Sequence, residues 1–127
     1  MTQFTLLFGS LLGGLAVLFG AFGAHALKKI LSDDQLKSFE TGVKYQLYHA
    51  IVLLVIGFNL ALKTTLETIM VYSFIAGIIL FSFSIYGLVI SSAKNKKLKF
   101  LGLITPLGGL LLIIGWVLLF IVVSGIK

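Results

Sequence analysis

The stretch GAFGAHALKK (residues 20–29) carries the chain out of one long apolar segment, and TGVKYQLYHA (residues 41–50) carries it into the next. Both histidines, three of the four acidic residues and four of the ten lysines lie between Gly20 and His49. Outside this stretch the chain is mainly apolar, because hydrophobic residues make up 59% of the sequence and charged residues only 11%. Soluble domains carry about 25% charged residues, so this composition indicates a membrane protein.

Four long blocks of the sequence contain no Lys, Arg, Asp or Glu: Phe4–Leu27, Tyr45–Leu62, Thr68–Ala93 and Phe100–Ile126. A membrane-spanning helix needs about 17–25 mostly apolar residues, which each block supplies. We therefore predict an all-α, integral membrane four-helix antiparallel bundle that forms one domain over residues 1–127, with spans at 4–27, 45–62, 68–93 and 100–126.

The formal charge of +6 comes from lysines in short loops. Four lysines lie between the first two spans and four between the last two, whereas only Lys63 and Lys127 lie at the other end. By the positive-inside rule, the lysine-rich loops face the cytoplasm and both termini lie outside the plasma membrane. The charge thus predicts membrane topology and not nucleic-acid binding. The first block has no basic region before it, so we expect a retained span and not a cleaved signal.

The connector between the first two spans carries a helix signal of its own. Ser32 followed by Gln35 fits a capping box, and Leu36, Phe39 and Val43 then fall at helical spacing. We predict a short amphipathic helix that lies in the cytoplasmic interface and ends near residue 42. A lid or a docking element for a partner is the alternative.

Small residues form a stripe along the first span, with spacings of four, three, four and three. In lipid, such stripes allow helices to approach closely, so we predict a helix-packing seam, within the bundle or between protomers. A second stripe in the third span makes it a candidate mate for the first. The predicted seam consists of Gly9, Gly13, Ala16, Gly20 and Gly23.

The less ordinary polar groups of all four spans fall in the cytoplasmic third of the predicted bundle. Tyr48 also fits an interfacial aromatic belt. Pro106 cannot donate to the carbonyl of Gly102 and should kink its helix. We therefore expect a cytoplasm-facing ligand or lipid site, with candidate residues His25, Tyr48, His49, Tyr86, Thr105 and Pro106.

Two histidines at similar depth could ligate a metal, hold a haem or act as a pH-sensitive pair. Zinc would need further ligands, and the sequence contains no cysteine. We favour histidines that are hydrogen-bonded to backbone carbonyls or to hydroxyl groups, with a lipid phosphate or small anion as the next interpretation. We expect no cofactor and no metal.

Transport and catalysis are weaker hypotheses. The size of the chain is that of small multidrug exporters, but no predicted span contains a carboxylate, and intramembrane ionisable groups are the usual markers of proton paths. No Ser/His/acid arrangement is visible, so we expect no enzyme.

Several of these motifs, taken in order along the chain, resemble one known family. The chain is similar to small bacterial membrane proteins of the YgdD/YwdK type, which are of unknown function and are similar to eukaryotic transmembrane protein 256. The resemblance implies a compact four-helix integral membrane protein and no known biochemical activity. The matching stretches are residues 20–28, 41–50 and 84–86, the segment 105–109, and Gly115 with Trp116.

Two hypotheses of function follow. The first is a non-enzymatic membrane protein whose site near the histidines binds a lipid headgroup, a small ligand or a partner protein. The second is a minimal transporter or channel, which must form an oligomer to enclose a path. Membrane lipids are the expected partners, together with a second copy of the chain or another membrane protein.

Overall fold

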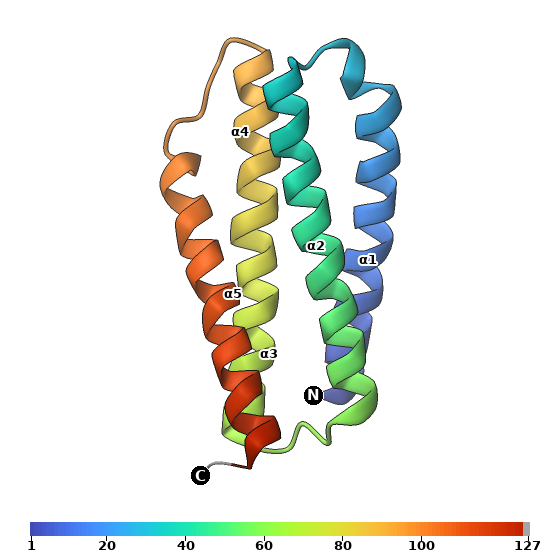
Figure 1. Cartoon of the computed structure of the whole chain (residues 1–127), viewed down its shortest axis with the longest axis vertical. Coiled ribbons are helices and arrows are strands. Elements are labelled where there is room, and N and C mark those ends of the chain that lie inside the picture. Colours follow the sequence, from blue (N-terminus) through green and yellow to red (C-terminus); the bar gives the residue numbers. More distant parts are fainter. Residues whose placement is uncertain (126–127) are drawn as a thin grey trace.

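The protein is a bundle of four long antiparallel helical rods, shown by a computed structural model that describes residues 1–125 (Figure 1). The predicted end of the fourth span at residue 126 lies outside the described residues, as does Lys127. No strand occurs within residues 1–125, and four helical segments are long and apolar enough to cross a membrane. The elements are α1 (Thr2–His25), η1 (Leu27–Lys29), α2 (Asp33–Asn59), α3 (Thr65–Ile78), η2 (Ile79–Phe83), α4 (Ser84–Ala93) and α5 (Leu101–Ser124).

The third rod is continuous and consists of α3, η2 and α4. η2 is one turn of π-helix, which inserts extra backbone between two α-helical segments and often occurs at functional sites. Both ends of the described chain lie at the same end of the bundle as the α2–α3 turn. The two lysine-rich connections lie at the opposite end, which we call the lysine end (Figure 1).

The predicted separate interfacial helix is wrong, because its residues form the first turns of α2. The capping box is confirmed: the Ser32 hydroxyl accepts from the Gln35 N–H, and the Gln35 side chain accepts from the Ser32 N–H. The helix then continues through Gly42 to Asn59. Phe39, on the apolar face of this segment, is 3% exposed. The apolar spacing of this segment therefore reflects its packing inside the protein.

The small-residue stripe of α1 faces α2. A Cβ on Gly9 would lie 3.0 Å from the Leu54 side chain, and one on Gly23 would lie 2.7 Å from the Phe39 ring. Ala16 is fully buried. The mate suggested by sequence was the third span, but the structure pairs the stripe with α2. The third rod meets α1 mainly through large rings, such as Phe4 against Tyr72 and Phe19 against Phe83.

The third rod packs its own small residues against α5. A Cβ on Gly77 would lie 2.8 Å from the Leu112 side chain, and one on Gly115 would lie 2.8 Å from the Phe74 ring. The closest approach is at Gly108, where a Cβ would collide with the backbone nitrogen of Phe81 and lie 2.7 Å from the backbone carbon of Leu80. α5 thus lies directly on the backbone of the third rod, beside the π-helical turn.

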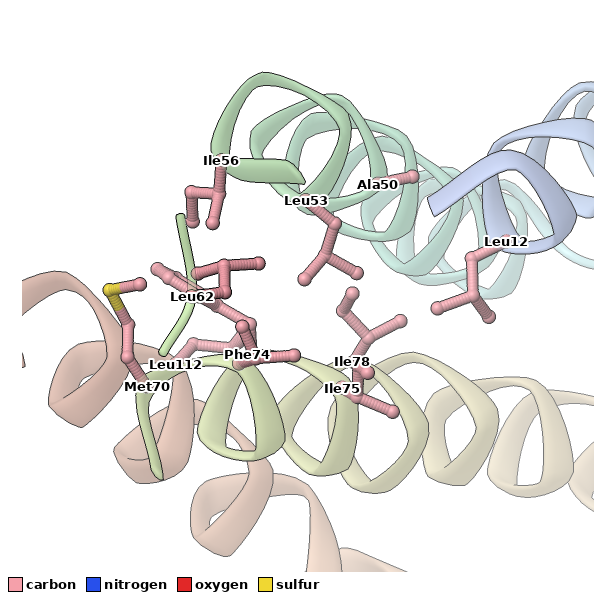
Figure 2. Packing of buried hydrophobic residues seen from close by; sticks show 11 residues of the cluster. Leu12, Ala50, Leu53, Ile56, Leu62, Met70, Phe74, Ile75, Ile78 and Leu112 are labelled. Atoms are coloured by element: carbon pink, nitrogen blue, oxygen red, sulfur yellow. The ribbon is translucent and has the colours of Figure 1, made fainter. Parts of the chain in front are cut away.

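The main core fills the half of the bundle near the termini. Figure 2 shows Leu53 of α2 and Ile78 of α3 pointing toward one another, with Leu12 of α1 beside them. Phe74 is fully buried in the same cluster. A second, smaller cluster lies at the lysine end and consists of Leu27, Leu31, Phe39, Tyr86 and Val89.

The α2–α3 turn is closed by a second capping box. The Glu67 carboxylate accepts from the backbone N–H groups of Lys63 at 2.8 Å and Thr64 at 2.9 Å, while the Thr64 hydroxyl accepts from the Glu67 N–H. Leu62 adopts a left-handed conformation with φ of 52° and is 4% exposed. This turn is therefore compact and leaves the charge of Glu67 engaged with backbone groups.

Candidate functional site

A buried polar network joins three helices near the middle of the bundle. The Gln46 amide nitrogen donates to the backbone carbonyl of Leu12 at 2.8 Å, and the Tyr86 hydroxyl donates to the Gln46 amide oxygen at 2.7 Å. Gln46 is fully buried, and the Tyr86 ring contacts the rings of Phe19 and Phe39. In an apolar environment, unpaired amide and hydroxyl groups would cost free energy, so this network links α1, α2 and α4 specifically.

Gly42 makes room for that network. A Cβ at this position would lie 2.7 Å from Cε1 of Tyr86. Its backbone carbonyl also accepts a hydrogen bond from the Ser82 hydroxyl of η2 at 2.7 Å. Gly42 therefore allows the third rod to approach α2 closely. It does not end the helix.

His49 links α2 to α5. The Trp116 indole nitrogen lies 3.0 Å from His49 Nε2, and His49 Nδ1 lies 2.7 Å from the Tyr45 carbonyl oxygen. An indole N–H can only donate, so Nε2 accepts and Nδ1 carries the proton that is donated to the carbonyl. Phe74 packs against both rings. Both ring nitrogens are thus engaged in hydrogen bonds: Nδ1 with a backbone carbonyl, as expected, and Nε2 with an indole, which was not predicted.

The six candidate residues occupy different places. His25, in the last turn of α1, and Tyr48, on the outer face of α2, are exposed. Tyr86 belongs to the Gln46 network and His49 to the Trp116 pair. Thr105 and Pro106 line a groove at the lysine end. Within residues 1–125, no group of three or more His, Cys, Asp or Glu side chains is placed to hold a metal ion.

Thr105 also fixes the start of α5 to the third rod. Its hydroxyl lies 2.6 Å from the Ser84 hydroxyl and donates to the Leu101 carbonyl at 3.2 Å. The Ser84 hydroxyl also lies 2.9 Å from the Phe81 carbonyl oxygen of η2, so its single proton is shared between that carbonyl and the Thr105 hydroxyl. The hydroxyls of Ser84 and Thr105 thus connect the π-helical turn with the wall of the groove.

The groove lies between the first turns of α2, the end of α4 and the start of α5, and has a volume of about 690 Å³. Its apolar wall includes Ile85, Leu88, Val89 and Pro106. We name it the lysine-end groove. Its charged and polar wall includes Asp34, Gln35, Ser38, Lys97, Lys99 and Thr105.

The charged side chains of the lysine-end groove are unpaired. Asp34, Lys97 and Lys99 make no ion pair or hydrogen bond through their side chains with residues 1–125, and the same holds for the Ser38 hydroxyl. By contrast, Gln35 is held at the end of the groove, because its amide nitrogen donates to the Ser92 hydroxyl at 3.5 Å. The groove thus presents one carboxylate, two ammonium groups and a free hydroxyl above an apolar wall.

The fold defines the class: this is a small multi-pass membrane protein built from four helices. Residues 19–109 match the model of a family described as protein of unknown function (DUF423), and the chain belongs to that family. It is 41% identical over 116 residues to a UPF0382 membrane protein of Staphylococcus aureus, covering 91% of each chain. It is 38% identical over 124 residues to the UPF0382 membrane protein YwdK of Bacillus subtilis, covering 96% of this chain and 95% of that one. No solved structure matches the chain.

The matching family confirms the resemblance drawn from the motifs. The family description and the names of these relatives state no enzymatic activity. Sequence reasoning missed Gln46, the partner of Tyr86, as well as Asp34 in the first turn of α2 and Lys97 and Lys99 in the α4–α5 connection. The available signal for Gln46 was an amide side chain inside an uncharged span, since such a group needs a hydrogen-bond partner in the membrane.

Proposed function

We propose that the protein is a non-enzymatic membrane protein that binds the phosphate-bearing headgroup of a membrane phospholipid in the lysine-end groove. The observation that carries this proposal is the pair of unpaired ammonium groups, Lys97 and Lys99, beside the apolar wall formed by α4 and α5. Ammonium groups and hydroxyls suit a phosphate, and the apolar wall suits the first methylene groups of an acyl chain.

The position of the groove along the bundle supports a lipid ligand. α2 has 27 residues and is therefore about 40 Å long, whereas the hydrocarbon core of a bilayer is about 30 Å thick. The excess is about two turns, and the first two turns of α2 contain Asp33, Asp34, Lys37 and Glu40. These turns therefore belong at headgroup level, where the phosphate of a neighbouring lipid lies.

The test is native mass spectrometry of the protein released from nanodiscs, comparing a Lys97→Ala/Lys99→Ala variant with the wild type. We expect the variant to lose most of the retained phospholipid. The matched control is Lys28→Ala/Lys29→Ala, which removes two exposed lysines from the same end but outside the groove. Equal loss in both variants would show general attraction to anionic lipid and would refute a specific site.

We further propose that the lysine end faces the cytoplasm and that both termini lie outside the plasma membrane. The lysine distribution and the shared location of the described chain ends support this topology. The chain has no cysteine, so single cysteines can be introduced without background. We expect Asn95→Cys to be protected from an impermeant maleimide in intact cells and Thr65→Cys to be labelled. The reverse pattern would refute the orientation.

A further inference from the structure

The lysine-end groove contains one group that a simple phosphate site does not need. Asp34 places a carboxylate in the same groove as Lys97 and Lys99. A helix N-terminus favours acidic residues in its first turn, but Asp33 already fills that role and does not line the groove. A carboxylate near a bound phosphate is repulsive unless a cation lies between them.

We propose that the lysine-end groove selects phospholipids whose headgroup carries a primary ammonium group in addition to the phosphate. The inference rests on the proposed lipid binding and names the headgroup. In the proposed complex, Lys97 and Lys99 contact the two non-bridging oxygens of the phosphodiester, and Asp34 accepts hydrogen bonds from the ammonium group of the lipid. Every charge that the groove leaves unpaired then has a partner of opposite sign.

The lining also distinguishes a primary from a quaternary ammonium group. Quaternary ammonium groups cannot donate hydrogen bonds and are typically bound by aromatic cages. None of the described residues that line the groove is aromatic, and the exposed Tyr45 and Tyr48 lie further along α2, outside it. The groove therefore offers hydrogen-bond acceptors for a primary amine and no stacking surface for choline. A glycerol headgroup offers hydroxyl donors to Asp34 but no positive charge, so the carboxylate would lack a cationic partner beside the phosphate.

The groove has room for such a ligand. Its volume of about 690 Å³ falls within the range of about 300–1,000 Å³ that is usual for small-molecule sites. The charged side chains lie toward the lysine end, and Ile85 and Pro106 contribute to the apolar wall. One headgroup with its glycerol backbone can therefore contact both kinds of wall at once.

The experiment is lipid competition in nanodiscs that contain phosphatidylethanolamine, phosphatidylglycerol and phosphatidylcholine in equal amounts with identical acyl chains. Bound lipid is read by native mass spectrometry. For the wild type we expect phosphatidylethanolamine to be enriched about fivefold or more over both competitors, since one partly exposed ion pair with hydrogen bonds is worth about that factor. Wild-type protein that retains phospholipid without this preference would refute the inference.

Paired variants separate the headgroup selection from lipid binding itself. Asp34→Asn should lose the preference but keep phospholipid bound, whereas Asp33→Asn, which changes the same charge in the same helical turn, should keep both. If Asp34→Asn keeps the preference, the assignment of the carboxylate is wrong. If retained phospholipid is independent of Lys97 and Lys99, the proposed function itself fails.

A second measurement needs no variant. Successive N-methylation of phosphatidylethanolamine removes one N–H donor at a time without removing the positive charge, until none remains in phosphatidylcholine. We expect retention by the wild-type protein to fall along this series. Equal retention of all four headgroups would refute recognition of the ammonium group through hydrogen bonds to Asp34.

Discussion

The two ends of the bundle use charged side chains in opposite ways. At the end near the termini, the Glu67 carboxylate is engaged by two backbone N–H groups, and the compact turn buries Leu62. At the lysine end, Asp34, Lys97 and Lys99 line a groove and have no ion-pair partner among residues 1–125. The same kinds of residue therefore stabilise the fold at one end and are free for a ligand at the other. Under the proposed function, the residues that stabilise the fold and those that bind the lipid are therefore separated along the helix axis.

The largest change in the free energy of unfolding should come from a substitution at Gly108, where α5 contacts the third rod. Gly108→Val would place its side chain against the backbone of Leu80 and Phe81, which cannot move aside as a flexible side chain can. We expect a loss of about 3 kcal/mol or more, because overpacking between backbones is poorly tolerated. Thermal unfolding in detergent measures it.

The control for this prediction is Gly14→Ala in α1, where an added Cβ would meet no atom within 4 Å. Alanine is a better helix former than glycine, so the control should be unchanged or slightly stabilised. Similar melting temperatures for the two variants would contradict the close packing of α5 on η2.

The next largest effect should come from the buried network. Tyr86→Phe removes the donor to Gln46 and leaves its amide oxygen without that partner. We expect a loss of about 1–2 kcal/mol, as is found for hydrogen bonds in membrane proteins. A double-mutant cycle with Gln46→Leu checks the contact, because the two effects should be less than additive if the groups act on each other.

A smaller loss of stability is expected from a substitution at the end of the bundle near the termini. Glu67→Ala removes the acceptor for two backbone N–H groups and should cost about 1 kcal/mol, the usual value for a capping interaction. Asp34→Ala at the lysine end should cost less, because the capping box of α2 uses Ser32 and Gln35 instead. Equal losses in chemical denaturation would remove the distinction between the two ends.

The smallest effect on stability is expected for the residues proposed to bind the lipid. Lys97→Ala/Lys99→Ala in lipid-free detergent should stay within about 0.5 kcal/mol of the wild type, because exposed side chains without partners contribute little to stability. A large loss of stability would mean that these lysines have a structural role, and the two ends of the bundle would then not differ in their use of charged side chains.

The membrane class and the four helical rods could be predicted from the sequence, because four uncharged blocks of this length are too apolar for the surface of a soluble domain. The Ser32–Gln35 capping box was also predictable, since both partners lie three residues apart. Such local and compositional signals do not depend on how the helices are rotated within the bundle.

The candidate site was harder to predict, because depth in the membrane does not give the direction of a side chain around its helix. His25 and His49 were placed near the same surface, yet one is exposed and the other contacts Trp116. The amphipathic connector was misjudged for a related reason: burial against α1 and α4 produces the same spacing as adsorption to a membrane surface. The π-helical turn further changes which face of α4 meets its neighbours.

The length of α2 has a consequence for the lipid environment. Because its polar first turns extend beyond the hydrocarbon core, the depth of the lysine-end groove depends on bilayer thickness. A thicker membrane would draw Asp34 toward the acyl chains at a desolvation cost, and a thinner one would lift the apolar wall into water. If the groove binds a phospholipid as proposed, headgroup binding should therefore change with the acyl-chain length of the surrounding lipids.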